Sequence, residues 1–469
     1  MAFGILEDHK LHSVPGTGLL SAKARQVTVG EATELKCGTG KYSHIVLIPQ
    51  PSCDSHDPLN WPRWKKEVCF WTLVFATSLE GALYSLATAG YVLLAKEFNV
   101  SVDEIASSFS AFLLGIAMFT LVQNTLAFKY GLRLVFLLST FLMFMSCLWN
   151  ALSPDLASIR ASRVFQGFGM AAPQALVPTA IEHVFFENDK TNIKKNPPTF
   201  LRQLKIYNGT FSDESVWKIF LRPFPFVLSP VTWFIFLSYS MPLVWFGLVS
   251  LCSSTIFVIT DHFNAAQVGL THLAGFVGVV LAISVTALND WAIIWMSQRN
   301  RGVYEPEYRL IFMLSMLFGV FGYVGWAVGS DHHMPWIGSV VCITMMNVSL
   351  VISGGAAVTY LLDTHRENAL HILSITTFAR EMVFYGSTFF ANGFILSRGI
   401  KLSLLILGAC QAVCWLVCIP MYVYGKRVRS FIARHPRLFR GDLTASDAPQ
   451  AQAAASTGTD SKRWASGGA

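Results

Sequence analysis

The sequence contains little charge. Asp, Glu, Lys and Arg make up only 13% of its 469 residues, whereas a typical soluble domain carries about 25%. Apolar residues gather instead in continuous runs of about 20, the length that an α-helix needs to cross a bilayer. Backbone polar groups in lipid must form hydrogen bonds within the protein, so membrane spans are either helices or strands of a closed barrel. Apolar and polar residues do not alternate in these runs as they would in barrel strands, so we expect helices. The sequence therefore predicts an all-α polytopic membrane protein and disfavours a soluble enzyme with buried core helices.

Motifs that carry catalytic chemistry are also missing. No Gly-x-x-x-x-Gly-Lys-Ser/Thr phosphate loop occurs, so nothing indicates transport driven by ATP hydrolysis within this chain. The sequence holds no nucleophile elbow and no zinc-ligand spacing. The adjacent His332 and His333 fall in a short loop, where solvated turn residues are the simpler interpretation. We therefore expect no enzyme activity, no cofactor and no metal site.

Cysteine is present, but not as a disulfide framework. Most of the nine cysteines lie within apolar runs. Cys410, Cys414 and Cys418 recur every four residues and so share one helical face. A metal or redox stripe is an alternative, but small packing residues explain this face better.

Ten apolar runs predict the membrane spans and, from them, how the chain is divided into regions. Their approximate ranges are 68–95, 106–127, 134–153, 158–182, 226–257, 267–291, 309–329, 335–361, 370–396 and 402–424. They predict five regions: a largely disordered cytosolic tail (1–66), a truncated four-helix bundle (67–186), a central cytosolic loop (187–225), a six-helix bundle (226–425) and a second cytosolic tail (426–469).

Basic residues predict the orientation. Lys129 and Arg133 lie between the second and third runs, and the region 187–225 is rich in Lys and Arg, whereas the alternate loops hold few. By the positive-inside rule both ends are then cytosolic. The net charge of +7 fits this pattern better than a nucleic-acid partner. The sequon at Asn99 falls in an outer loop and is a predicted glycosylation site, whereas the sequon at Asn208 lies on the cytosolic side.

Several stretches resemble one transporter family. "RASRVFQGFGMAA" is similar to the fourth-helix motif R-x-x-Q-G-x-G-x-A of the major facilitator superfamily, matched by Arg163, Gln166, Gly167, Gly169 and Ala171. "NTLAFKYGLR" stands where that family has its loop motif between helices two and three. "DPLNWPRWKK", "LRPFPFVLSP" and "RNRGVYEPEYRL" resemble fungal members of the drug:proton antiporter-like branch. The resemblance covers approximately residues 57–425.

The resemblance implies a function. Members of this family move solutes by alternating access, with the site between two helical bundles near the membrane midplane. It implies proton-coupled export of a small drug, toxin or secondary metabolite. The partners would be that solute, protons and the lipid bilayer, with a monomer favoured. We expect the plasma membrane, with the vacuolar membrane as the alternative. A proton-coupled importer and a truncated, non-transporting relative remain open.

Two departures from the family stand out. Phe128 occupies the position that is usually acidic in the loop motif. The other gating-loop residues of the motif are present, namely Lys129, Gly131 and Arg133. At the related position in the second half, Asp290 keeps the acidic side chain. This puts in doubt the charged latch between the two halves. In addition, the family has twelve spans, but here four precede the central loop. Helices five and six are apparently lacking, so helices one and four should lose neighbours and expose small-residue faces.

Ionisable groups within the spans are the candidate site residues. Each costs about 2.5–3.5 kcal/mol at the bilayer centre on insertion scales, so it usually faces a cavity and a partner. We predict that Glu80 carries the proton and that Arg163 modulates the protonation of Glu80. The alternative for Glu80 is a structural polar contact. The alternative for Arg163 is a side chain that reaches the outer lipid headgroups. Cavity residues are then predicted from their spacing or chemistry: Tyr84, Gln166, Met170, Gln174, Asn347, Arg380 and Glu381. For Arg380 and Glu381 an interhelical ion pair or a loop contact is the alternative, and His272 and Asn347 are more simply interhelical hydrogen-bonding groups.

Overall fold

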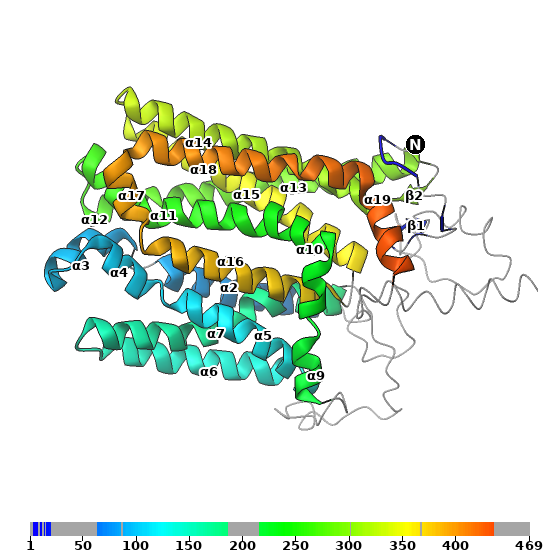
Figure 1. Cartoon of the computed structure of the whole chain (residues 1–469), viewed down its shortest axis with the longest axis horizontal. Helices are drawn as coiled ribbons and strands as arrows, with labels where there is room; N and C mark the ends of the chain where they lie inside the picture. Colours follow the sequence, from blue (N-terminus) through cyan, green and yellow to red (C-terminus); the bar gives the residue numbers. More distant parts are fainter. Residues whose placement is uncertain are drawn as a thin grey trace, which may run out of the picture.

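Long helices run side by side along one axis of the molecule (Figure 1). This computed structural model describes residues 3–7, 10–11, 14, 16–19, 63–85, 88–185, 215–300, 302–365 and 368–435. Within that part, seven helical segments are long and apolar enough to cross a membrane: 102–130, 132–151, 230–260, 265–299, 306–331, 336–365 and 400–434. The predicted spans 158–182 and 370–396 also coincide with helices. The all-α polytopic class is confirmed.

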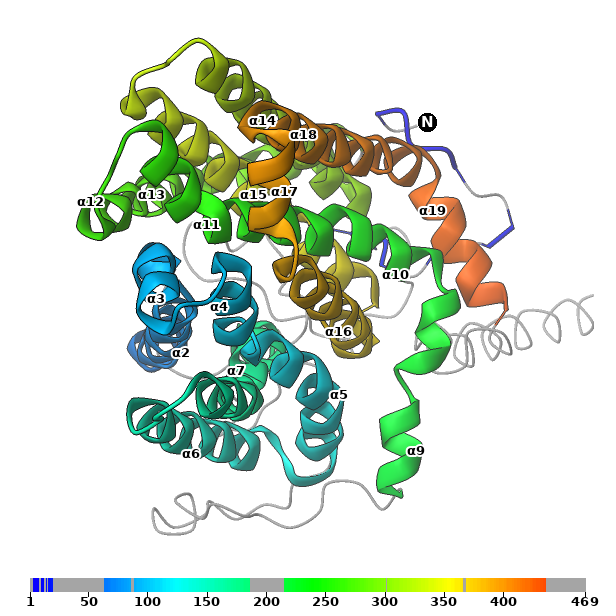
Figure 2. The same ribbon diagram turned by 60° about the vertical axis from the view of Figure 1, so that its left-hand side comes forward.

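The first half of the chain forms one group of helices, in blue and cyan in Figure 2. Its elements are α2 (Arg63–Ser85), η3 (Thr88–Gly90), α3 (Tyr91–Phe98), α4 (Val102–Phe109), α5 (Phe112–Tyr130), α6 (Leu132–Ala151) and α7 (Leu156–Phe185). The expected single span 68–95 is wrong at its end, because α2 stops at Ser85 and a separate helix begins at Tyr91. Gly131, with a φ of 88°, makes the turn from α5 into α6, a backbone conformation that favours glycine.

Glycines let α5 and α7 touch. A Cβ on Gly115 would lie 2.1 Å from the carbonyl oxygen of Val164, and a Cβ on Gly167 would lie 2.1 Å from that of Phe112. Small residues at such crossings allow helices in lipid to approach closely. The motif residue Gly167 therefore lies at a close contact between α5 and α7.

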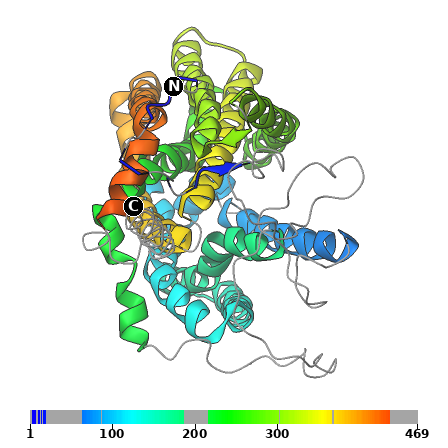
Figure 3. The same ribbon diagram turned by 90° about the vertical axis from the view of Figure 1, so that its right-hand side faces the viewer.

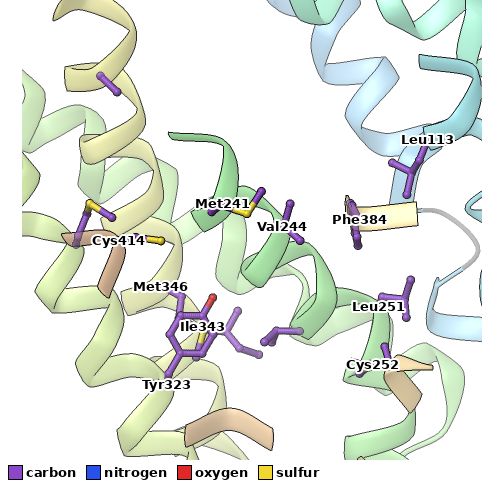
Figure 4. Packing of buried hydrophobic residues seen from close by; sticks show 14 of the residues in the cluster. Leu113, Met241, Val244, Leu251, Cys252, Tyr323, Ile343, Met346, Phe384 and Cys414 are labelled. Atoms are coloured by element: carbon purple, nitrogen blue, oxygen red, sulfur yellow. The ribbon is translucent and has the colours of Figure 1, made fainter. Parts of the chain in front are cut away.

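The second half forms the other group, in green to orange in Figure 2. Its elements are α9 (Val216–Leu221), η4 (Phe224–Leu228), α10 (Pro230–Ile235), η5 (Phe236–Ser240), α11 (Met241–Thr260), α12 (Ala265–Thr271), α13 (Leu273–Arg299), β2 (Val303–Tyr304), η6 (Pro306–Leu314), α14 (Ser315–Asp331), α15 (Trp336–His365), α16 (Ala369–Thr388), α17 (Ala391–Arg398), α18 (Ile400–Leu416) and α19 (Cys418–Arg434). Figure 4 shows its core, where Met241 and Val244 of α11 lie near Cys414 and Met346.

The last helix continues past the predicted end of the bundle at residue 425. Its Arg429 is fully buried and pairs with Glu307 at 2.8 Å and with Glu305 at 3.2 Å. A buried arginine is tolerated because these carboxylates neutralise it and accept its hydrogen bonds. The predicted tail therefore begins later than expected, and residues 436–469 lie outside the described part.

Described residues of the predicted N-terminal tail pack on the second half. Ile5 is 1% exposed and lies with Ile293, Met296 and Tyr308. Lys426 donates to Glu7 and to Glu305, each at 2.7 Å. The short strand β1 (Gly18–Leu19) pairs antiparallel with β2. This segment is thus ordered, while residues 20–62, the rest of the predicted disordered tail, lie outside the described part.

Helix α2 has few protein neighbours. In Figure 3 this blue helix lies at the edge of the molecule. Within residues 64–82, Glu80 is the one buried side chain. Large apolar residues such as Trp71 and Phe75 suit contact with lipid, but the small residues Ala76 and Gly81 are exposed as well.

Candidate functional site

A cavity of about 610 Å³ lies between the two halves. Helices α2 and α7 of the first half and α11, α15 and α16 of the second half line it. Polar and aromatic side chains are prominent in its lining, together with one methionine. They include Glu80, Met170, Gln174, Tyr239, Phe246, His272, Asn347, Arg380, Glu381 and Phe384. Of the predicted cavity residues, the structure thus brings together Met170, Gln174, Asn347, Arg380 and Glu381.

Glu80 is the carboxylate that the first half contributes to this cavity. Its side chain is 4% exposed, and its Oε1 has no hydrogen-bond partner among the described residues. It lies close enough to Glu381 and Arg380 to interact with both electrostatically. A buried carboxyl without a full set of partners is costly when ionised, which suits a group that takes up and releases a proton.

Arg380 joins the two halves at the same place. Its Nε donates to Oε1 of Glu381 at 2.9 Å, and its Nη2 donates to Oε1 of Gln174 at 2.9 Å. This ion pair joins two residues of α16, whereas the alternative left open from the sequence was an interhelical ion pair or a loop contact. Arg380 makes both the ion pair with Glu381 and the contact across the halves with Gln174, because Arg380 and Glu381 both line the cavity.

Arg163, which the sequence predicted as the modulator of Glu80, does not line this cavity and contacts other residues. Its Nη1 donates to Oε1 of Gln166 at 3.0 Å, and its guanidinium sits 5.1 Å from the ring centre of Phe109. It is 7% exposed, so it is not a headgroup arginine either. Arg163 lies about 16 Å before Gln174 along α7. Neither Arg163 nor Gln166 is among the residues that line the cavity.

The comparisons with known proteins agree with this geometry. Residues 73–190, from α2 to beyond the motif at Arg163, match the model of the Major Facilitator Superfamily. This part of the chain is similar to that superfamily. This is a family of transporters rather than enzymes, and its fungal members include proteins similar to this chain along most of its length.

Two relatives and one solved structure illustrate the similarity. Protein HOL1 of Saccharomyces cerevisiae is 20% identical over 535 residues, covering 84% of this chain and 91% of HOL1. The MFS-type efflux pump MFS2 of Trichophyton rubrum is 22% identical over 474 residues, covering 84% of this chain and 78% of the pump. An outward-facing crystal structure of a bacterial homologue of the iron transporter ferroportin has 12% identity and a TM-score of 0.43, covering 73% of this chain and 97% of that one.

The remaining predicted residues fall outside the cavity lining or outside the part of the chain that the structure describes. Lys129 and Gly131 end α5, and Arg133 lies in the first turn of α6. Asn99 is exposed in the turn after α3, with a φ of 53°, and its glycosylation remains a prediction. Two side chains lie outside the described part, namely Tyr84 in α2 and Asp290 in α13.

Sequence reasoning missed the aromatic lining of the cavity. Tyr239, Phe246 and Phe384 face it, but among 36 phenylalanines and 13 tyrosines nothing in the pattern separates lining rings from lipid-facing ones. His272 was expected to make an interhelical hydrogen bond. It lines the cavity instead, and its Nε2 has no hydrogen-bond partner among the described residues.

At the end of the molecule that is predicted to be the outer one, Asp103 ties the halves together. Its Oδ1 and Oδ2 accept from the backbone N–H groups of Asn392 and Gly393 at 2.9 and 2.8 Å. We expect Asp103→Asn to lose one of the two bonds, because the amide nitrogen cannot accept. The expected cost is about 1.5–3 kcal/mol for the closed outer contact, measured as faster hydrogen exchange in α17.

The neighbouring Glu104→Gln serves as the control for this prediction, since Glu104 is exposed at the same end of α4. Equal exchange in α17 for both variants would show that Asp103 does not hold this contact.

Proposed function

We propose that this protein is a proton-coupled transporter that exports a small organic solute by alternating access. The single observation that carries the proposal is the cavity between the halves, in which a buried carboxyl, Glu80, faces Glu381 and Arg380. The drug:proton antiporter-like motifs and the similarity to an efflux pump of Trichophyton rubrum support export. The direction of transport and the plasma membrane location are part of this proposal.

The proton carrier that we propose is the one expected from the sequence, but the modulating arginine is a different residue. Glu80 carries the proton, and Arg380 takes the modulating role that the motif assigned to Arg163. When Glu80 is ionised, the positive charge of Arg380 is shared between two carboxylates. When Glu80 is protonated, Arg380 pairs with Glu381 alone. The bond from Arg380 to Gln174 then links the protonation state to the contact between the halves.

Arg163 acts as a structural group in this proposal. Its contact with Phe109 connects α7 to α4, and its hydrogen bond to Gln166 lies within α7. The cation–π contact and the hydrogen bond reduce the cost of keeping its charge buried.

Flux through liposomes tests the function. The purified protein is reconstituted into liposomes, and a pH gradient is imposed across the membrane. Ethidium is a suitable first probe, because the cavity combines two carboxylates and one arginine with the rings of Phe246 and Phe384. We expect accumulation of ethidium that depends on the gradient and stops when an ionophore collapses it. Ethidium movement that ignores the gradient would support a carrier without proton coupling.

A second candidate, a non-transporting protein derived from such a carrier, has an observation of its own. Helix α2 exposes small residues along with its large ones, as expected of a helix that lacks a neighbour. The alignment with HOL1 is also longer than this chain, so that relative carries residues with no counterpart here. We propose that helices five and six are among them. The predicted junction near residues 187–195 lies outside the described part.

Sequencing the transcript across the codons for residues 187–195 separates the two candidates. An in-frame segment encoding two further helices in the major transcript would support transport by the longer product. A transcript without it, together with folded protein that moves no ethidium, would favour the non-transporting protein.

A further inference from the structure

The position at which the family has an acidic latch residue makes a different contact here. Phe128, near the end of α5, stacks on the ring of His371 in the first turn of α16. The ring centres are 5.1 Å apart and the planes differ by 6°. His371 also stacks on Phe226 of η4, with ring centres 5.9 Å apart and planes 21° apart. His371 thus contacts one ring of the first half and one ring of the second, and it is only 4% exposed.

The residue before His371 is held by the first half as well. Leu370 is 6% exposed and belongs to an apolar cluster whose other buried members come from α5, α6 and α7, namely Ala127, Val135, Ala172 and Leu176. One turn further along α16, Ser374 accepts a hydrogen bond from the Nδ2 of Asn124 in α5. Three positions in the first turns of α16 therefore dock on the first half.

This contact lies at the end of the molecule that the basic residues predict to be cytosolic. Lys129 follows Phe128 directly, Arg133 lies beyond the turn, and Arg222 of the second half acts electrostatically on His371. At the opposite end, Asp103 holds the backbone of α17. Helix α16 and its continuation α17 are thus attached to the first half at both ends, with Arg380 between them.

We propose that Phe128, Leu370 and His371 form an uncharged inner gate that replaces the acidic latch of the family and must open for the solute to enter the cavity from the cytosolic side. Stacked rings and a buried leucine hold the halves together by contact area and close packing, and this does not require a buried carboxylate. The role as a gate rests on the proposed transport function, whereas the closed contact itself does not.

Hydrogen exchange measured by mass spectrometry on the full chain in nanodiscs tests the gate without any substrate. We expect Phe128→Ala to speed exchange roughly tenfold in residues 373–380 and 123–130, because these amides are exposed when the contact opens locally. Residues 391–398 at the outer end should keep the exchange rate of the unmodified protein. Phe128→Tyr and His371→Phe keep two stacked rings and should leave exchange unchanged.

The matched control is Phe141→Ala, since Phe141 lies on α6 with 57% of its side chain exposed. Unchanged exchange in Phe128→Ala would overturn the proposal, as would faster exchange spread equally to residues 391–398. If Phe128→Ala fails to fold, Leu370→Ala provides the same test from the other half. A gate that opens as expected in a protein that moves no ethidium would refute the transport function and leave the contact standing.

Discussion

Glu80→Gln is expected to remove the response of transport to a pH gradient. The amide keeps the size of the side chain but cannot take up or release a proton. In a carrier that exchanges one proton for each solute molecule, one pH unit changes the solute gradient by about tenfold, equivalent to about 1.4 kcal/mol. Ethidium accumulation by the variant in liposomes should therefore be the same at every imposed gradient.

The control for this prediction is Glu97→Gln, because Glu97 is exposed on α3 and does not line the cavity. It should accumulate ethidium as the unmodified protein does. A Glu80→Gln variant that still follows the pH gradient would assign proton coupling to another group, of which Glu381 is the nearest in this cavity.

Gly167→Ala is expected to destabilise the first half. A methyl group at this position would lie 2.1 Å from the carbonyl oxygen of Phe112 and 2.8 Å from the Cα of Gly115. Those atoms belong to the backbone and cannot rotate away, so α5 and α7 must separate. Overpacking of this kind costs about 1–3 kcal/mol, and we expect the upper end of that range as a lower midpoint of thermal unfolding in detergent.

Gly355→Ala is the matched control, because Gly355 is an exposed helical glycine of α15 whose added Cβ would meet no atom within 4 Å. It should leave the midpoint unchanged or raise it, since alanine favours a helix by about 1 kcal/mol over glycine. Equal midpoints for the two variants would show that α5 and α7 do not depend on this close approach.

The fourth-helix motif contains both Gly167 and Arg163. The motif identified Gly167, and the structure places this glycine at a close contact between α5 and α7. The motif also identified Arg163, but the structure gives it contacts with Gln166 and Phe109. The motif identifies which residue type stands on the helix. The partner of that residue depends on which polar groups of the neighbouring helices lie at the same height along the helix axis.

The sequence alone determined the all-α membrane class, the positions of most helices and several residues of the cavity. These follow from apolar runs of the length of a bilayer and from the cost of placing Glu80 or Arg380 in lipid, both of which are properties of short stretches. The tertiary structure decided which of these groups meet. Glu80 lies 300 residues before Arg380 in the chain, and Phe128 meets His371 across the two halves. Such pairs depend on helix packing over long sequence separations, which local hydropathy and spacing do not encode.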